Sequence, residues 1–245
     1  MWLNISIQPE YVAKIGNFYI SNTLLSSWIA MLILIIMGII IRIRIKDVPS
    51  VKSLQNFFEI IIDYLLKFIN SLTGSKTLTQ SIFPLIFTFF IFIISANLLG
   101  LLPGFLGAIF IESEGARISL FRSQNSDLNS TLALAIISVL SIQYFGIKRL
   151  GVKRYLKRFF NFTNPIKLFL GFFEILSDLN KTLSLSLRLF GNILGGEVLL
   201  MVIAFILPYF IPLPFMILEV FVGIVQAFIF STLSLVFIVT AEKEF

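Results

Sequence analysis

The feature that most restricts the fold of this chain is a series of uncharged, apolar runs, each long enough to cross a lipid bilayer. No charged residue occurs in residues 15–41, 77–111 or 128–147. A helix needs about 20 apolar residues to cross a hydrocarbon core of about 30 Å. Because lipid offers backbone groups no water, each run must satisfy its own hydrogen bonds as a helix. The sequence therefore predicts an all-α integral membrane protein.

These runs and the polar breaks between them predict five crossings within a single membrane domain, residues 1–245. The expected crossings are residues 24–45, 80–102, 128–147, 165–207 and 215–240, and an amphipathic helix over residues 51–72 separates the first two.

The fourth expected crossing, residues 165–207, has no proline after its first residue. At 1.5 Å per residue it would extend about 60 Å, twice the bilayer core. We therefore expect it to be kinked, strongly tilted or preceded by an interfacial segment. Pro208, Pro212 and Pro214 are expected to form the turn that follows it.

Basic residues gather in two of the loops. Arg42, Arg44 and Lys46 follow the first crossing, and six basic residues lie within residues 148–158. The positive-inside rule assigns both loops to the cytoplasm, which places the N-terminus outside and the C-terminus in the cytoplasm. The net charge of +6 thus reflects topology and contact with anionic membrane lipids. Nucleic acid is not an expected partner, because no stacking aromatics are interleaved with these charges on a soluble module.

The composition also limits the chemistry that the chain supports. With no cysteine and no histidine, the usual ligands of zinc, copper, haem and iron–sulfur clusters are missing, so we expect no metal site and no cofactor. A phosphate-binding loop of the GxxxxGK[ST] kind is also absent from the sequence, which argues against nucleotide binding.

A single arginine, Arg188, lies within the apolar run of residues 181–200. Its guanidinium stays protonated, and a charge at membrane depth costs about 2.5–3.5 kcal/mol on insertion scales. We therefore expect Arg188 to face protein or water; the alternative is that it snorkels to the interface. At 100° per residue, five small or polar residues share its face of the helix: Glu174, Lys181, Ser184, Asn192 and Gly195. Glu197 points the opposite way.

Two other polar features each allow two interpretations. Glu59 and Asp63 lie on the polar stripe of residues 51–72, where they either line an aqueous vestibule or belong to a solvated surface with an Asp63–Lys67 ion pair. Asn97 lies inside the second crossing and serves either as a hydrogen-bonding link between helices or as a channel contact. In the loop of residues 105–127, acidic and basic residues are nearly balanced, and Asp127 is placed to cap the next helix.

Several sequence blocks resemble one family when they are read in order. They are NLLGLLPG (97–104), SDLNSTLALA (126–135), NPIKLFLGFFE (164–174), SLSLRLFGNILGGE (184–197) and, after Glu219, QAFIF (226–230). Together they resemble subunit a of the rotary ATP synthase, over about four fifths of the chain, and the GGE that ends the fourth block is of the bacterial type.

This resemblance implies a stator subunit that carries protons and is not an enzyme by itself. Its implied partners are the c-ring, the b subunits of the peripheral stalk and membrane lipids. The implied location is the bacterial plasma (inner) membrane, with a mitochondrial or plastid membrane as the alternative. The hairpin of residues 165–240 would pack against the c-ring, and two offset half-channels would meet the ring carboxylates there.

The resemblance also assigns roles to single residues. Arg188 would hold a ring carboxylate and block direct leakage, while Glu197 and Glu219 would line the outer half-channel. The family commonly has a histidine at one of those two positions, whereas this chain has glutamate at both. We therefore expect the two carboxylates to share a proton. The alternative for Glu197 is a glutamate that is merely hydrogen-bonded inside the bundle. Gly100 stands where the family often has an acidic residue, which weakens a proton role for that corner.

Further positions are assigned in the same way. Asn192 and Gln226 would hydrogen-bond near the arginine, and Glu174 with Ser177 or Asp178 would belong to the inner half-channel. A secondary transporter or channel with an intramembrane Arg/Glu site is the competing interpretation, but it predicts inverted repeats or paired broken helices, which are not found. A purely structural assembly subunit would not need Arg188.

Overall fold

In the computed structural model, residues 10–16, 18–44, 54–101, 110–113, 116–119, 122–159, 165–207 and 210–243 are described. Within these ranges, five helices are long and apolar enough to cross a membrane. They are α1 (Asn22–Arg44), α3 (Lys76–Leu101), α4 (Leu128–Leu150), α6 (Pro165–Ile206) and α7 (Pro212–Lys243). The prediction of an all-α membrane protein with five crossings is confirmed.

The remaining helices are α2 (Leu54–Thr73) and α5 (Val152–Phe159). α2 is the amphipathic helix expected over residues 51–72, although residues 51–53 lie outside the described residues. Its exposed side carries the Lys67–Asp63 ion pair at 2.7 Å, and its apolar side buries Leu65 and Ile69. α5 begins within the basic loop of residues 148–158 and ends at Phe159; no helix was predicted there.

The helix boundaries differ from the predicted ones by a few residues. α3 begins four residues early, at Lys76, and α4 runs on to Leu150, where Gly151 at φ 77° ends it. The prolines were partly misassigned: Pro212 is the first residue of α7, and Pro214 also lies within its first turn. Proline is compatible with a first helical turn, where its missing N–H has no partner to lose. Pro208 lies outside the described residues.

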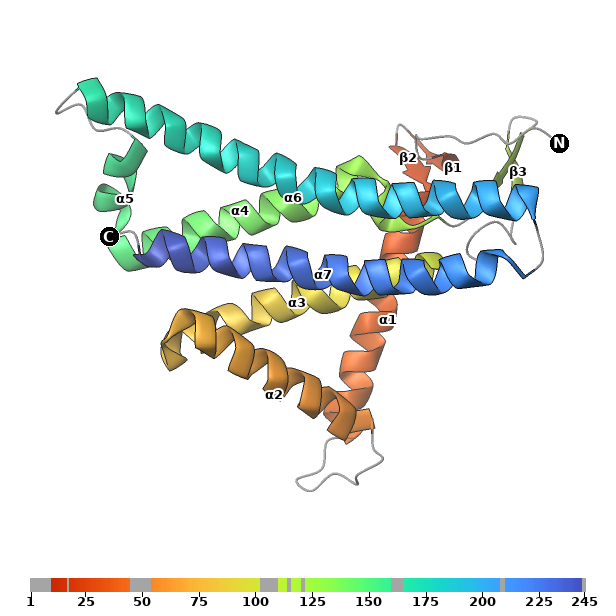
Figure 1. Ribbon diagram of the computed structural model, residues 1–245, viewed down its shortest axis with the longest axis horizontal. Coiled ribbons are helices and arrows are strands. Elements are labelled where there is room, and N and C mark those ends of the chain that lie inside the picture. The colour runs from red at the N-terminus through yellow and green to blue at the C-terminus, as the bar shows by residue number, and fades with distance from the viewer. Residues whose placement is uncertain are drawn as a thin grey trace.

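α6 is one uninterrupted helix of 42 residues. It runs along the longest axis of the molecule with α7 antiparallel to it, and the two diverge toward the end that carries α5 (Figure 1). α4 packs against both of them, and α3 packs mainly against α7. α1 crosses the direction of this pair steeply in Figure 1, and it packs mainly against α3 and the η1 turn (Gln124–Ser126). α6 thus continues as one helix from Pro165 to Ile206, and the expected kink, strong tilt or interfacial segment stays a prediction.

Two short antiparallel hairpins lie near the end of the molecule where α6 joins α7 (Figure 1). They consist of β1 (Tyr11–Ile15) with β2 (Phe18–Ser21), and β3 (Phe110–Ser113) with β4 (Ala116–Ser119). Neither was predicted. Gly16, at φ 63°, supplies the left-handed backbone conformation that the turn after β1 requires.

Buried polar side chains tie the helices together. Asp127 caps α4 by accepting a hydrogen bond from Asn129 N, as predicted, and it also accepts one from Thr23 Oγ1 of α1 at 2.9 Å. Asn97 Nδ2 donates to the Gly223 carbonyl of α7 at 3.0 Å, and Asn97 Oδ1 accepts from Asn125 at 2.7 Å. Asn97 is thus a link between helices, the first of its two predicted roles.

The five-crossing topology predicts which exposed residues share a side of the membrane. Lys14→Cys and Phe210→Cys should react with an impermeant maleimide from one side, and Lys76→Cys and Lys153→Cys only from the other. Odd numbers of crossings separate the two pairs, and all four positions are exposed. The measurement is labelling in right-side-out and inverted membranes, with the cysteine-free parent as the blank.

Ser123→Cys serves as the burial control for this labelling. Ser123 is only 6% exposed, so its cysteine should react slowly from either side. Labelling of Lys14→Cys and Lys153→Cys from the same side would contradict the five-crossing topology.

Candidate functional site

The orientation of α6 is set by an apolar stripe at four-residue spacing. Leu185, Leu189 and Ile193 are almost completely buried in a core shared with α3, α4 and α7. Side chains four residues apart lie on one face of a helix. Because lipid tails are as apolar as leucine, a contact of this kind inside a membrane is stabilised by close van der Waals packing, and the opposite face of α6 is left on the outside.

Arg188 lies on that outside face. Arg188, Ser184, Asn192 and Gly195 are all exposed in the single chain, and Arg188 Nη2 donates to Ser184 Oγ at 3.3 Å. Among the described residues, no hydrogen bond joins Arg188 to Asn192 or Gln226; Gln226 is half-buried on α7. The predicted polar stripe is therefore present as one surface, and Arg188 is open to whatever covers that surface.

Glu197 lies on the other face, four residues after Ile193, and continues the buried stripe. It is 6% exposed, and its carboxylate meets Arg122, which is 8% exposed. Arg122 Nε lies 3.2 Å from Glu197 Oε1 and 3.4 Å from Oε2. A charge-assisted contact of this kind compensates two charges that would each be costly to bury alone. Arg122 belongs to the nearly balanced loop of residues 105–127, and its partnership with Glu197 was not predicted.

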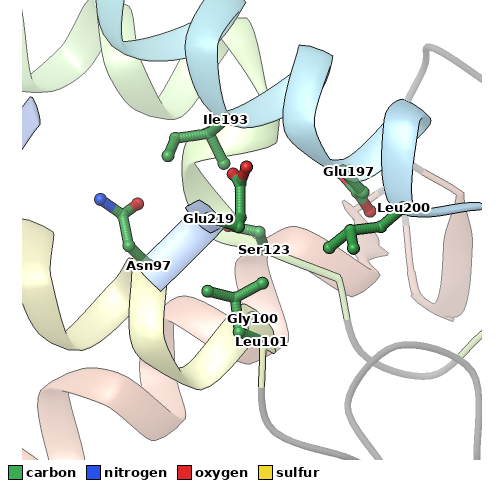
Figure 2. A pocket seen from close by; sticks show the side chains of 8 residues that line it. All are labelled: Asn97, Gly100, Leu101, Ser123, Ile193, Glu197, Leu200 and Glu219. Carbon is green, nitrogen blue, oxygen red and sulfur yellow. The ribbon is translucent and has the colours of Figure 1, made fainter. Parts of the chain in front are cut away.

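Glu219 of α7 reaches toward the same region of α6 (Figure 2). It is 8% exposed, and it lies against Gly196, where an added Cβ would overlap the carboxylate of Glu219. Gly196 therefore has a specific role: its missing side chain makes the space that the Glu219 carboxylate occupies.

Both glutamates line one small cavity between α3, α6, α7 and the segment before η1 (Figure 2). Its volume is about 20 Å³, which is enough for one water molecule. The other lining residues are Asn97, Gly100, Leu101, Ser123, Ile193 and Leu200. Two carboxylates around a water-sized space form an arrangement that can bind and pass protons.

Gly100 lines this cavity, although the sequence analysis had given little weight to its corner. A Cβ at residue 100 would come within 2.7 Å of Ser123 Cβ, closer than side-chain carbons approach each other. Gly100 thus lets the segment before η1 pack directly on α3. In this chain the corner supplies a close contact between α3 and Ser123 beside the two glutamates.

The residues predicted for an inner half-channel lie in the first half of α6. Asp178 Oδ1 lies 2.8 Å from Lys181 Nζ, and Asp178 Oδ2 accepts from Gln143 Nε2 at 2.6 Å. Tyr155 of α5, which is buried, donates from its hydroxyl to Gln143 Oε1. Both oxygens of Asp178 are thus engaged.

The neighbouring inner residues, Glu174 and Ser177, are each partly exposed. Across the described residues, no group of three or more Asp, Glu, His or Cys side chains is placed to hold a metal ion. The polar positions of α6 form three sets: Glu174, Ser177 and Asp178 in its first half, the exposed surface of Arg188, and Glu197 beside the small cavity.

Comparison with known proteins adds independent evidence. The sequence model of the family described as ATP synthase A chain matches residues 24–239. ATP synthase subunit a of Syntrophobacter fumaroxidans is 34% identical over 97% of this chain and 91% of its own length. The subunits a of Gloeobacter violaceus (36%; 91% and 84%) and of the chloroplast of Bigelowiella natans (32%; 94% and 89%) are also similar. The family match and these nearly end-to-end alignments show that this chain belongs to the family of ATP synthase subunit a.

Proposed function

We propose that this chain is the stator subunit that leads protons through two offset half-channels to and from the carboxylates of the c-ring. Membership of the family makes it a component of the proton-translocating membrane sector of ATP synthase. The observation that carries the finer proposal is the two-sided character of α6. Arg188 is exposed on one face, and the outer glutamates are enclosed on the other.

In this proposal the exposed Arg188 surface faces the c-ring. A fixed cation about 4 Å from a ring carboxylate contributes roughly 4 kcal/mol at an effective dielectric of 20. That exceeds the roughly 2.3 kcal/mol per 100 mV that drives one charge across the membrane. The guanidinium therefore holds an ionised ring carboxylate until it is exchanged. The same charge repels a proton moving straight between the half-channels, so flow requires rotation of the ring.

Two sets of acids serve the two half-channels. Glu197 and Glu219, beside the water-sized cavity, form the outer one. Glu174 and Ser177 form the inner one, and Asp178 anchors that region because both of its oxygens are engaged. Asn192, exposed beside Arg188, and Gln226 on α7 are assigned to hydrogen bonds near the arginine in the assembled complex.

We also propose a bacterial plasma membrane location, with the N-terminus outside and the C-terminus in the cytoplasm. The exposed basic residues Lys148 and Lys153 lie at the end of the molecule assigned to the cytoplasm, as the positive-inside rule requires. Anionic lipids of that leaflet and the b subunits of the peripheral stalk are the further partners. The subunit conducts protons, and the synthesis of ATP takes place in other subunits.

Replacing Arg188 distinguishes two roles: a gate, meaning a charge that prevents direct proton leakage between the half-channels, and a charge that only stabilises the fold. Arg188→Ala should assemble but lose ATP synthesis and ATP-driven pumping, while membranes stripped of the soluble head still conduct protons passively, because no charge separates the half-channels. Arg188→Lys should assemble and give no measurable synthesis, since it lacks the planar guanidinium and a buried ammonium deprotonates more readily. Synthesis near the parental rate in Arg188→Lys would disprove the gate.

Replacing Glu219 tests the outer half-channel. Glu219→Gln should slow proton-driven synthesis by at least about 100-fold, the scale of a lost proton-transfer group. Glu219→His should recover part of that rate, because imidazole also exchanges protons near neutral pH. The measurement is ATP synthesis in energised vesicles per assembled complex. An unchanged rate in Glu219→Gln would remove Glu219 from the path.

Gly196→Ala tests the space that holds the Glu219 carboxylate. The added methyl group would displace this carboxylate, and a displacement of about 1 Å can lower a rate up to 100-fold. Gly38→Ala in α1 is the matched control, since nothing lies within 4 Å of its added Cβ. Synthesis per complex should fall in the first variant and stay within about twofold of the parent in the second. Equal rates in both variants would contradict the role of Gly196 in making space for the Glu219 carboxylate.

A further inference from the structure

The buried contact between Arg122 and Glu197 has no role in the function proposed above. We propose that Arg122 is a positioning residue of the outer acid site: it holds Glu197 as a fixed, ionised counter-ion, so that Glu219 alone exchanges protons there. This inference rests on the proposed function, since it divides the work of the two outer glutamates. It replaces the expectation from the sequence that they share one proton.

The backbone around Arg122 is held on several sides. Arg122 N donates to Ser26 Oγ of α1 at 3.3 Å, and Ser26 is itself buried. Five residues later, Asp127 caps α4 and accepts from Thr23 of α1. The guanidinium is therefore presented to α6 from a segment fixed between two helices, and the position of its charge is set by the fold.

Both members of the pair are more than nine-tenths buried. The Nε of Arg122 contacts both carboxylate oxygens of Glu197, so protonation of Glu197 would remove the opposite charge that lies beside the buried guanidinium. Removing one charge of a buried pair is strongly unfavourable, whereas removing both is often close to neutral. Glu197 is therefore poorly suited to gain and lose a proton in every cycle.

Glu219 differs in its surroundings. In the part of the chain that the structure describes, no ion pair or hydrogen bond ends on its carboxylate, which lies between Gly196 and the cavity. That cavity has room for one water molecule as a proton donor. One carboxylate is thus held and the other is free to exchange.

A double-mutant cycle separates a held glutamate from a proton carrier. The variants are Arg122→Gln, Glu197→Gln and the two combined, each tested in vesicles that carry the assembled complex. Each single variant should lower proton-driven synthesis per complex about 10- to 100-fold, because it removes one charge of a buried pair and displaces the site. The double variant should recover to within about fivefold of the parent, since neither charge remains.

Arg149→Gln is the matched control, because it breaks the pair that Arg149 forms with the buried Glu242, at the other end of the molecule. It should keep synthesis per complex within about twofold of the parent. If Arg122→Gln behaves like this control, or lowers only the amount of assembled complex, the pair is structural and the inference fails. If the double variant stays as slow as Glu197→Gln, Glu197 itself carries protons and the inference also fails.

Arg122→Lys decides the matter if Arg122→Gln does not assemble. It keeps a cation near Glu197 without the fork of the guanidinium, so at least about a tenth of parental synthesis is expected, and complete loss in an assembled complex would overturn the inference. Arg188→Lys, measured in the same vesicles, tests the proposed function separately. Retained synthesis in Arg188→Lys would disprove the proposed role of Arg188, whatever the results for the Arg122 variants.

Discussion

The packing of one apolar stripe, Leu185, Leu189 and Ile193, against α3, α4 and α7 determines where every polar group of α6 lies. Because the helix is unbroken, fixing that stripe fixes the rotation of all its turns. Arg188 is consequently placed outside, and Glu197, one turn beyond Ile193, is placed inside. A hydrophobic contact without chemistry of its own thus separates the two kinds of charged site. The buried site then needs its own compensation, which Arg122 supplies from outside the helix.

Much of this arrangement could be predicted from the sequence because it depends on helical periodicity. The spacing of Arg188, Ser184 and Asn192 indicated a common face, and Glu197 was expected on the opposite one. Asp127 was recognised as a cap from its place before an apolar run. These predictions need only the pitch of one helix and the thickness of a bilayer, and neither depends on how the helices pack.

The partner of Glu197 could not be predicted in this way. Arg122 lies 75 residues from it in a segment without periodicity, so only the tertiary fold brings the two together. The α5 helix was missed because its basic residues indicated a loop, and it is held by the buried Tyr155 rather than by a long apolar stripe. The hairpins are too short for strand alternation to be distinct. The close contact of Gly100 with Ser123 likewise depends on two segments meeting.

The continuity of α6 has a consequence for how its length can change. Arg188 and Glu197 are nine residues apart, about 13 Å along the helix axis. Because both lie on one continuous helix, the distance between them is fixed. Tilting α6 moves both sites together and leaves their separation unchanged. Inserting or deleting one residue between them would turn Glu197 by about 100° away from Arg122. This interval can change only in steps that preserve the face, close to whole helical turns.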